Sequence, residues 1–297
     1  MTDTMAAPGA VLLQSTVRPG RRLRNLAATV WMWGALLVAL IPLGAVIYYL
    51  VSKGIAVFNL SFLTEDIPAS PRRTGGGMGP AVVGTLIITL TAAVMAIPTG
   101  ILGAIYLHEY GAKGKLAAVT RFMADVMSGV PSIVMGLFIY ATWVLVFGLS
   151  GFAGALALAA LMLPIVIRST EEMLRLVPNE LREASYALGN SKWRTIVTVV
   201  LPAAMAGITS GAMLAVARAA GETAPLLFCV GVTSKVNWNV FSGANTALSA
   251  QIFANAQTTF AGAQERALGA AFTLVAIVFL LTVLARFISS RYSVKTR

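Results

Sequence analysis

Residues 126–167 read VMSGVPSIVMGLFIYATWVLVFGLSGFAGALALAALMLPIVI and carry no charged side chain. A straight helix of 42 residues would be roughly 63 Å long, about twice the thickness of a bilayer core. The stretch must therefore fold back on itself, and the segment GLSG at 148–151 is the natural turn because Gly and Ser favour chain reversal. The sequence here predicts two membrane helices, near 124–147 and 151–168.

The composition of the whole chain excludes a soluble protein and a disordered one. Hydrophobic residues make up 58% of the 297 residues and charged residues only 11%, whereas soluble domains carry about 25% charged residues. Disordered chains are polar and rich in charge, which is the opposite pattern. Further charge-free stretches complete the prediction of an all-α integral membrane protein with about six transmembrane helices, near 27–51, 80–107, 124–147, 151–168, 195–217 and 267–288.

The remaining long segment, 223–264, does not read as a span. Its first part is apolar but too short, and its second part is rich in Asn, Gln, Ser and Thr. We expect an outer connection with short helices that cap or re-enter the membrane. The first span is too long for the h-region of a signal peptide and is expected to remain as an anchor. The prolines at 42, 98, 131, 164 and 202 are expected to kink the helices that contain them.

The basic residues predict the orientation of these spans. The net charge is +11, and 16 of the 22 Lys and Arg residues fall on the side that holds both termini, against five on the other side. The positive-inside rule places that side in the cytoplasm. We therefore expect a cytoplasmic tail at 1–26, a transmembrane domain at 27–290 and a second cytoplasmic tail at 291–297. The scattering of the charges over tails and short loops argues against nucleic-acid binding.

The cytoplasmic loop 169–194 is unusually rich in charge and contains a predicted amphipathic helix. Pro178 suits a first helical turn, and Gly189 is a plausible C-terminal stop. Between them, apolar residues recur on one face at helical spacing: Leu181, Ala184 and Leu188. Periodicity alone leaves two alternatives open for the helix at 178–189, a groove on a partner protein or lipid headgroups.

The residues of this loop and the next span carry a known motif. Glu183-Ala184-Ser185, then Gly189 and Val199-Val200-Leu201-Pro202, resembles the EAA motif E-A-A-x3-G-x9-I-x-L-P. That motif belongs to permease subunits of binding-protein-dependent ABC importers, and the departures are Ser185 and Val199. The resemblance implies a type I ABC importer permease fold, in which 178–189 is the coupling helix that docks on an ATPase subunit. Its implied contacts are Leu181, Glu183, Ala184, Leu188 and Gly189.

A pair of charges marks the outer end of the fifth span. Arg218 and Glu222 are four residues apart and so share a helical face on which they can pair. Intramembrane charges are usually functional, and a guanidinium binds oxyanions through two parallel hydrogen bonds. Glu222 can hold Arg218 in place or accept a hydrogen bond from a protonated oxyanion, which favours hydrogen phosphate over sulfate. A purely structural ion pair is the alternative. Asp125 follows Arg121 by four residues and is expected to pair with it.

Two further runs look like signatures of the phosphate-specific members of this importer family. They are ARAAGETAPLL at 217–227 and PIVIRSTEE at 164–172, and the resemblance covers roughly residues 75–290. In that family an Arg and a Glu at these places are tied to phosphate transport, which implies this role for Arg218 and Glu222. Arg168 and Glu171 are further candidates, either touching phosphate or stabilising the inner mouth of the pathway.

The resemblance also implies the surroundings of the chain. It predicts a non-catalytic, multi-pass subunit of a bacterial inner membrane, surrounded by lipid and paired with a related second permease as a heterodimer. Two cytoplasmic ATPase subunits and an extracytoplasmic phosphate-binding protein complete the predicted complex. No cofactor is expected on this chain, because no P-loop is present and ATP and Mg belong to the ATPase subunits. With one Cys and one His, no Cys/His metal cluster is expected either.

Other functions remain as alternatives. A permease for another oxyanion, such as sulfate or molybdate, would share the same architecture. A stand-alone secondary transporter or a membrane scaffold would work without any ATPase. A membrane enzyme would need a nucleophile with its base, or a metal site, and the sequence offers neither pattern.

Overall fold

The computed structural model describes residues 19–111 and 114–292. Most of the predicted tail at 1–26 and of the tail at 291–297 lies outside these described residues, as does Lys113. The chain divides into two compact units, Met1–Tyr49 and Leu50–Arg297. Every regular element in the described part is a helix, which confirms the predicted all-α class.

The first unit consists, in its described part, of most of the long helix α1 (Pro19–Gly54). The helix runs continuously through Pro42, and its large apolar side chains are exposed along its length. Its residues Gly20–Gly54 are long and apolar enough to cross a membrane. The first predicted span, 27–51, is therefore confirmed as a helix and is longer than predicted.

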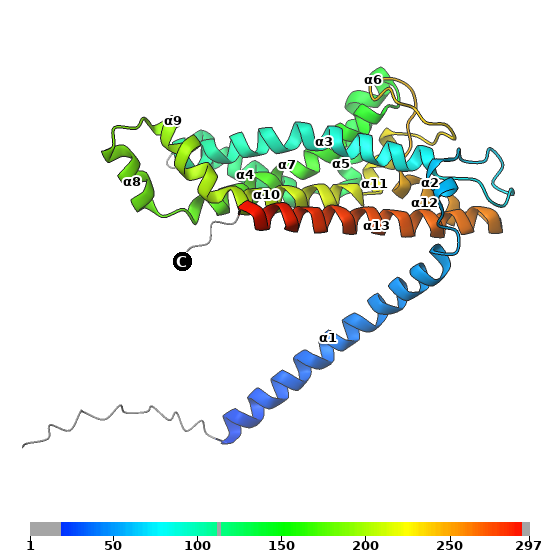
Figure 1. The fold of residues 1–297 in the computed structure, drawn as a ribbon, viewed down its shortest axis with the longest axis horizontal. Coiled ribbons are helices and arrows are strands. Elements are labelled where there is room, and N and C mark those ends of the chain that lie inside the picture. The colour runs from blue at the N-terminus through cyan, green and yellow to red at the C-terminus, as the bar shows by residue number, and fades with distance from the viewer. Residues whose placement is uncertain (1–18, 112–113, 293–297) are drawn as a thin grey trace, which may run out of the picture. The chain divides into compact units, whose positions relative to one another are not determined.

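The second unit is built on four long helices that lie side by side (Figure 1): α3 (Gly79–Ile105), α7 (Gly151–Arg175), α10 (Leu201–Ala220) and α13 (Ala261–Tyr292). Helix α3 packs on α7, α7 on α10, and α10 on α13. Two of these helices are lengthened by π-helical turns, α3 by η1 (Tyr106–Tyr110) and α10 at its start by η3 (Ile196–Val200). These elements correspond to four of the predicted spans.

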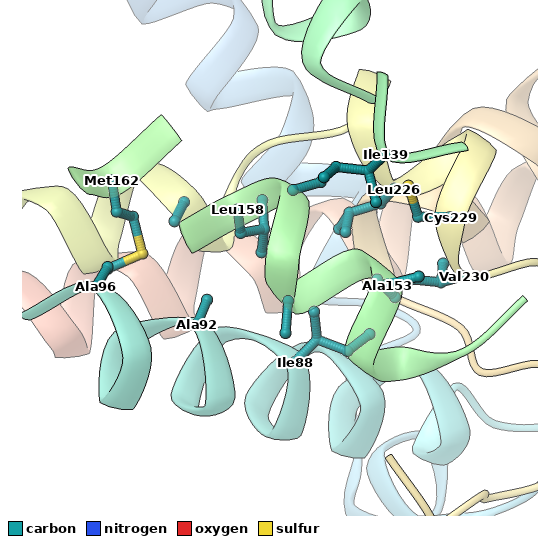
Figure 2. Packing of buried hydrophobic residues seen from close by; sticks show 14 of the residues in the cluster. Ile88, Ala92, Ala96, Ile139, Ala153, Leu158, Met162, Leu226, Cys229 and Val230 are labelled. Carbon is teal, nitrogen blue, oxygen red and sulfur yellow. The ribbon is translucent and has the colours of Figure 1, made fainter. Parts of the chain in front are cut away.

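Small residues bring α3 and α7 close together, as Figure 2 shows. Ala92 and Ala96 of α3 and Ala153 of α7 lie within a buried cluster, together with Ile88 and Leu158. Small side chains let helix backbones approach in a membrane, where dispersion contacts rather than a hydrophobic force hold helices together. This contact fixes α7 as the central helix of the unit, and α7 carries residues of both cavities described below.

The predicted span at 124–147 is present as a bent pair of helices, and the predicted kink at Pro131 is confirmed as a full break. Helix α4 (Lys115–Gly129) and the segment Ser132–Phe147 meet at an angle of 106°. That segment comprises α5 (Ser132–Ile139), η2 (Tyr140–Val144) and α6 (Leu145–Phe147). Pro131 cannot donate a helical hydrogen bond and disfavours a helical conformation at Val130, whose ψ of 127° is extended. The described residues thus contain five spanning helices, or six if the bent pair counts as one.

The turn after this broken segment is confirmed. Gly148 has a φ of +86°, a conformation that favours glycine. Ser150 then caps α7, because its hydroxyl accepts a hydrogen bond from the amide of Ala153 at 3.1 Å. The chain therefore reverses within 148–151, as the sequence predicts.

The two ends of the second unit differ in character. One end carries the short helices α2 (Leu60–Thr64), α11 (Ala224–Cys229) and α12 (Leu248–Ala256). Of these, α11 and α12 confirm the short helices expected in 223–264. The other end carries α8 (Asn179–Ala187) and α9 (Lys192–Thr195), as Figure 1 shows. The predicted helix at 178–189 is therefore present as α8, preceded by Pro178 and followed by Gly189 with a φ of +82°.

Candidate functional site

A cavity of about 240 Å³ lies beside the predicted charge pair. Four helices and the α4–α5 break supply its walls, and the lining comprises Met127, Ser128, Val130, Pro131, Ser132, Leu161, Met162, Pro164, Ile165, Ala215, Arg218, Ala219 and Glu222. Ser128 and Ser132, on either side of the break between α4 and α5, line this cavity. The site therefore contains a guanidinium, a carboxylate and two hydroxyl groups in otherwise apolar surroundings.

The charge pair itself has the predicted partners. Nε of Arg218 lies 3.6 Å from Oε1 of Glu222, and the Arg218 side chain is 69% exposed whereas that of Glu222 is 18% exposed. The backbone carbonyl of Glu222 accepts a hydrogen bond from Ser249 at 2.9 Å, which ties this segment to α12. Most of the guanidinium surface therefore remains open to a ligand, while the carboxylate is held close to the protein.

Arg218 lies at the end of the fifth span, as predicted, and the cavity that it lines also reaches the middle of α7. The last turn of α10 holds Arg218, and residues 161–165 of α7 border the cavity. Helix α10 ends at Ala220, and the chain continues into the separate helix α11, which packs on α5 and α7. A discontinuous helix with a charged site midway along a bundle is typical of transporter binding sites.

A second cavity, of about 140 Å³, contains the other two predicted residues. Arg168 and Glu171 line it together with Leu107, Arg121, Ala124, Asp125, Ile167, Glu172 and Arg175. Glu171 accepts hydrogen bonds from Arg121 at 2.9 Å and from Arg175 at 3.2 Å, whereas Arg168 pairs with Asp125. The predicted pair between Arg121 and Asp125 is therefore wrong, because contacts between α4 and α7 replace the contact within α4.

The two cavities lie along the same pair of helices. Successive stretches of α4 and α7 line first one and then the other, and in each the acidic side chains match the basic ones in number. Each cavity therefore presents arginine side chains without a net positive charge.

The end of the unit that holds α8 presents the predicted apolar strip. Leu181, Ala184 and Leu188 are all exposed, as is Glu183. The opposite face of α8 is buried through Arg182 and Ser185, and the Ser185 hydroxyl lies 2.9 Å from that of Thr195 in α9. The outer face is thus free for a partner, while the inner face attaches α8 to its own chain.

Sequence reasoning missed three polar residues at these sites, namely Ser128, Ser132 and Arg182. The two serines flank Gly129-Val130-Pro131, and that helix-breaking sequence was the available signal for a polar opening in an apolar span. Arg182 carried no comparable signal, because a charged residue in a charged loop reads as solvent-exposed. Among the described residues, no group of three or more His, Cys, Asp or Glu side chains is placed to hold a metal ion.

Comparison with known proteins agrees with this architecture. Residues 96–294 match the model of the family described as binding-protein-dependent transport system inner membrane component. The chain belongs to this family. It is 44% identical over 278 residues to the phosphate transport system permease protein PstA 1 of Mycobacterium tuberculosis (strain ATCC 25618 / H37Rv), covering 91% of this chain and 90% of that protein. The permease protein PstA of Yersinia pestis is 44% identical over 275 residues, covering 91% and 92%.

Solved structures of other importers share the fold. A chain of the MetNI methionine ABC transporter matches with a TM-score of 0.58 and 20% identity, over 73% of this chain and 95% of that one. A chain of a bacterial alginate ABC transporter, in complex with its periplasmic protein, matches with a TM-score of 0.61 and 12% identity, over 90% and 95%. The predicted ABC importer permease fold is confirmed by these matches and the family.

Proposed function

We propose that this chain is a permease subunit of an ATP-driven importer of inorganic phosphate. The observation that carries the proposal is the 44% identity, over nine-tenths of the chain, to proteins named as phosphate transport permeases. The Arg218 cavity supports it independently, because its groups match the chemistry of a tetrahedral oxyanion. Importers of sulfate or molybdate remain the alternative that the experiment below must separate.

Each polar group of the Arg218 cavity has a role in this proposal. The Arg218 guanidinium donates two parallel hydrogen bonds to the oxyanion. Glu222 accepts a hydrogen bond from a protonated phosphate oxygen, a bond that fully ionised sulfate cannot donate. Ser128 already donates to the Ala124 carbonyl at 2.8 Å, so its oxygen can accept, whereas the Ser132 hydroxyl can donate or accept. The site therefore favours an anion that carries a proton.

The second cavity lies next along α4 and α7, and we assign it to the inner part of the pathway. Glu171 is held by two arginines, so it positions Arg121 and Arg175 rather than binding the anion itself. Arg168 is about half exposed and pairs with the equally exposed Asp125, so it can exchange that partner for phosphate. Phosphate would then pass from Arg218 toward Arg168.

The same proposal defines the surroundings of the chain. A related second permease completes the pathway, because the exposed guanidinium of Arg218 leaves one side of the site open at the surface of this chain. One of the two ATPase subunits binds the exposed strip of α8 on the cytoplasmic side, where both termini also lie, and the ATPase subunits hold ATP and Mg. An extracytoplasmic phosphate-binding protein delivers the anion at the opposite end of the second unit, which carries α2 and α12. The chain itself catalyses no reaction.

The test is uptake of radiolabelled phosphate by cells that lack their own phosphate importers. Cells that express the complete complex should take up phosphate, and excess sulfate or molybdate should not compete. Inactivating the ATPase subunits should abolish uptake. Competition by sulfate would favour the other oxyanions, and uptake that persists without ATPase activity would show a secondary transporter instead.

A further inference from the structure

The inner face of α8 contains a buried arginine that belongs to neither proposed anion site. Arg182 is 8% exposed, although it lies in a short helix at the end of the molecule. It is adjacent to the exposed Leu181 and Glu183, so one turn of α8 presents an apolar contact outward and a guanidinium inward. Burying a guanidinium is costly unless its donors are paired, so its contacts indicate what the residue holds together.

The Arg182 guanidinium joins two other helices to α8. Nη1 donates to the carbonyl oxygen of Val177 at 2.6 Å, and Nη2 donates to that of Leu174 at 2.9 Å; Leu174 lies in the last turn of α7, and Val177 lies just beyond its end. Nε and Nη2 also reach Oε1 of Glu109, at 3.3 and 3.1 Å. Carbonyl groups at a helix end have no partner within their helix, so Arg182 caps α7 while it pairs with a second element.

Glu109 lies in η1, the π-helical turn that ends the α3 helix. Its side chain is only 7% exposed, and its backbone carbonyl accepts a hydrogen bond from Lys192 of α9. Arg182 of α8 and Lys192 of α9 therefore both contact Glu109 of η1. A π-helical turn is a local departure from α-helical hydrogen bonding that is frequent at functional sites.

We infer that Arg182 is a positioning residue that couples movement of α8 to α7 and α3 during transport. Displacement of α8 by the ATPase subunits pulls on the carbonyls at and just beyond the end of α7 and on Glu109 together, because a single guanidinium binds both. Helix α7 lines both cavities, and α3 packs along its length. The two helices therefore move with α8 as one body, and the anion sites open or close with them. This inference rests on the proposed function as an ATP-driven transporter.

The test measures how much phosphate is transported for each ATP hydrolysed. The complete complex, with its binding protein, is reconstituted in proteoliposomes, and both rates are recorded for the wild type and for Arg182→Met. We expect the transport-to-hydrolysis ratio to fall about tenfold, which corresponds to ~1.4 kcal/mol. Arg182→Lys keeps the positive charge but cannot donate to several acceptors from one planar guanidinium, so its transport-to-hydrolysis ratio should lie between those of the wild type and Arg182→Met. Glu109→Gln should also lower the ratio, and the double variant should be no worse than Arg182→Met.

The controls separate coupling from simple stability. Arg194→Met removes an exposed basic side chain from the same loop and should leave the ratio unchanged. A residue that only supports the fold would reduce transport and hydrolysis in proportion, so an unchanged ratio in Arg182→Met would overturn the inference. If Arg182→Met does not assemble, the transport-to-hydrolysis ratios of Arg182→Lys and Glu109→Gln are measured instead, and unchanged ratios in both would overturn the inference. If the wild type carries another anion, the proposed substrate is wrong, and the ratio is measured with the anion that it does carry.

Discussion

Replacement of Leu188 by Ala should weaken binding of the ATPase subunits without disturbing the permease. Leu188 is 83% exposed at the C-terminal end of α8, so its truncation leaves no cavity in this chain. Ala is also at least as favourable as Leu in a helix. If the side chain enters a groove on the ATPase, the loss of its three outer carbons costs ~2.4 kcal/mol at ~0.8 kcal/mol for each buried carbon. That energy corresponds to roughly 60-fold weaker binding.

The assay is titration of the purified permease pair, in detergent, with labelled ATPase subunits. Leu176→Ala is the matched control, because Leu176 is 73% exposed and precedes α8 without belonging to its apolar strip. Leu176→Ala should bind as the wild type does, while Leu181→Ala should weaken binding less than Leu188→Ala because Leu181 is only half as exposed. Wild-type affinity of the Leu188 variant, or equal losses at Leu176 and Leu188, would refute the assignment of this strip to the ATPase.

Three other substitutions or reactions test the local structure. Gly189→Ala places a side chain at a φ of +82° with no neighbour within 4 Å of its Cβ, so a backbone cost of ~1–2 kcal/mol should reduce ATPase co-purification. Gly84→Ala puts a Cβ 1.9 Å from the carbonyl oxygen of Thr246 and should lower the melting temperature of the complex, whereas Gly44→Ala, with open space around it, should not. The Cys229 thiol is fully buried, and its burial raises its pKa to about 11, so maleimide should label it only after denaturation. Rapid labelling of Cys229 in the native complex at neutral pH would contradict its burial.

Features that repeat along the chain could be predicted from the sequence. The length of each charge-free stretch predicts the membrane-spanning helices. The spacing of apolar residues between Pro178 and Gly189 predicts α8. The pair of Arg218 and Glu222 was also predictable, because residues four apart meet on one helical face and in the structure they do. These inferences use only neighbours in sequence, which local geometry brings together.

Contacts between distant segments could not be predicted in this way. Arg121 binds Glu171, 50 residues away, and not the nearby Asp125, because packing of α4 on α7 offers it a buried partner. Arg182 is buried for a similar reason, since its long side chain reaches Glu109 and the end of α7. The helix break at Val130-Pro131 could be predicted only in part. The proline predicts a kink, but it predicts neither a bend of 106° nor a polar cavity beside it.

The central claim is that Arg218 binds the transported anion, and uptake of labelled phosphate by an Arg218→Gln complex tests it most directly. The Arg218 side chain is 69% exposed, so solvent screens its pairing with the more buried Glu222 and the pair contributes at most ~1 kcal/mol; this complex should therefore assemble normally with its partners. Arg286→Gln, which removes an exposed arginine outside both cavities, serves as the control. The account predicts that the Arg218 variant assembles but takes up no phosphate, while the Arg286 variant transports normally. Wild-type phosphate uptake by an assembled Arg218→Gln complex would contradict it.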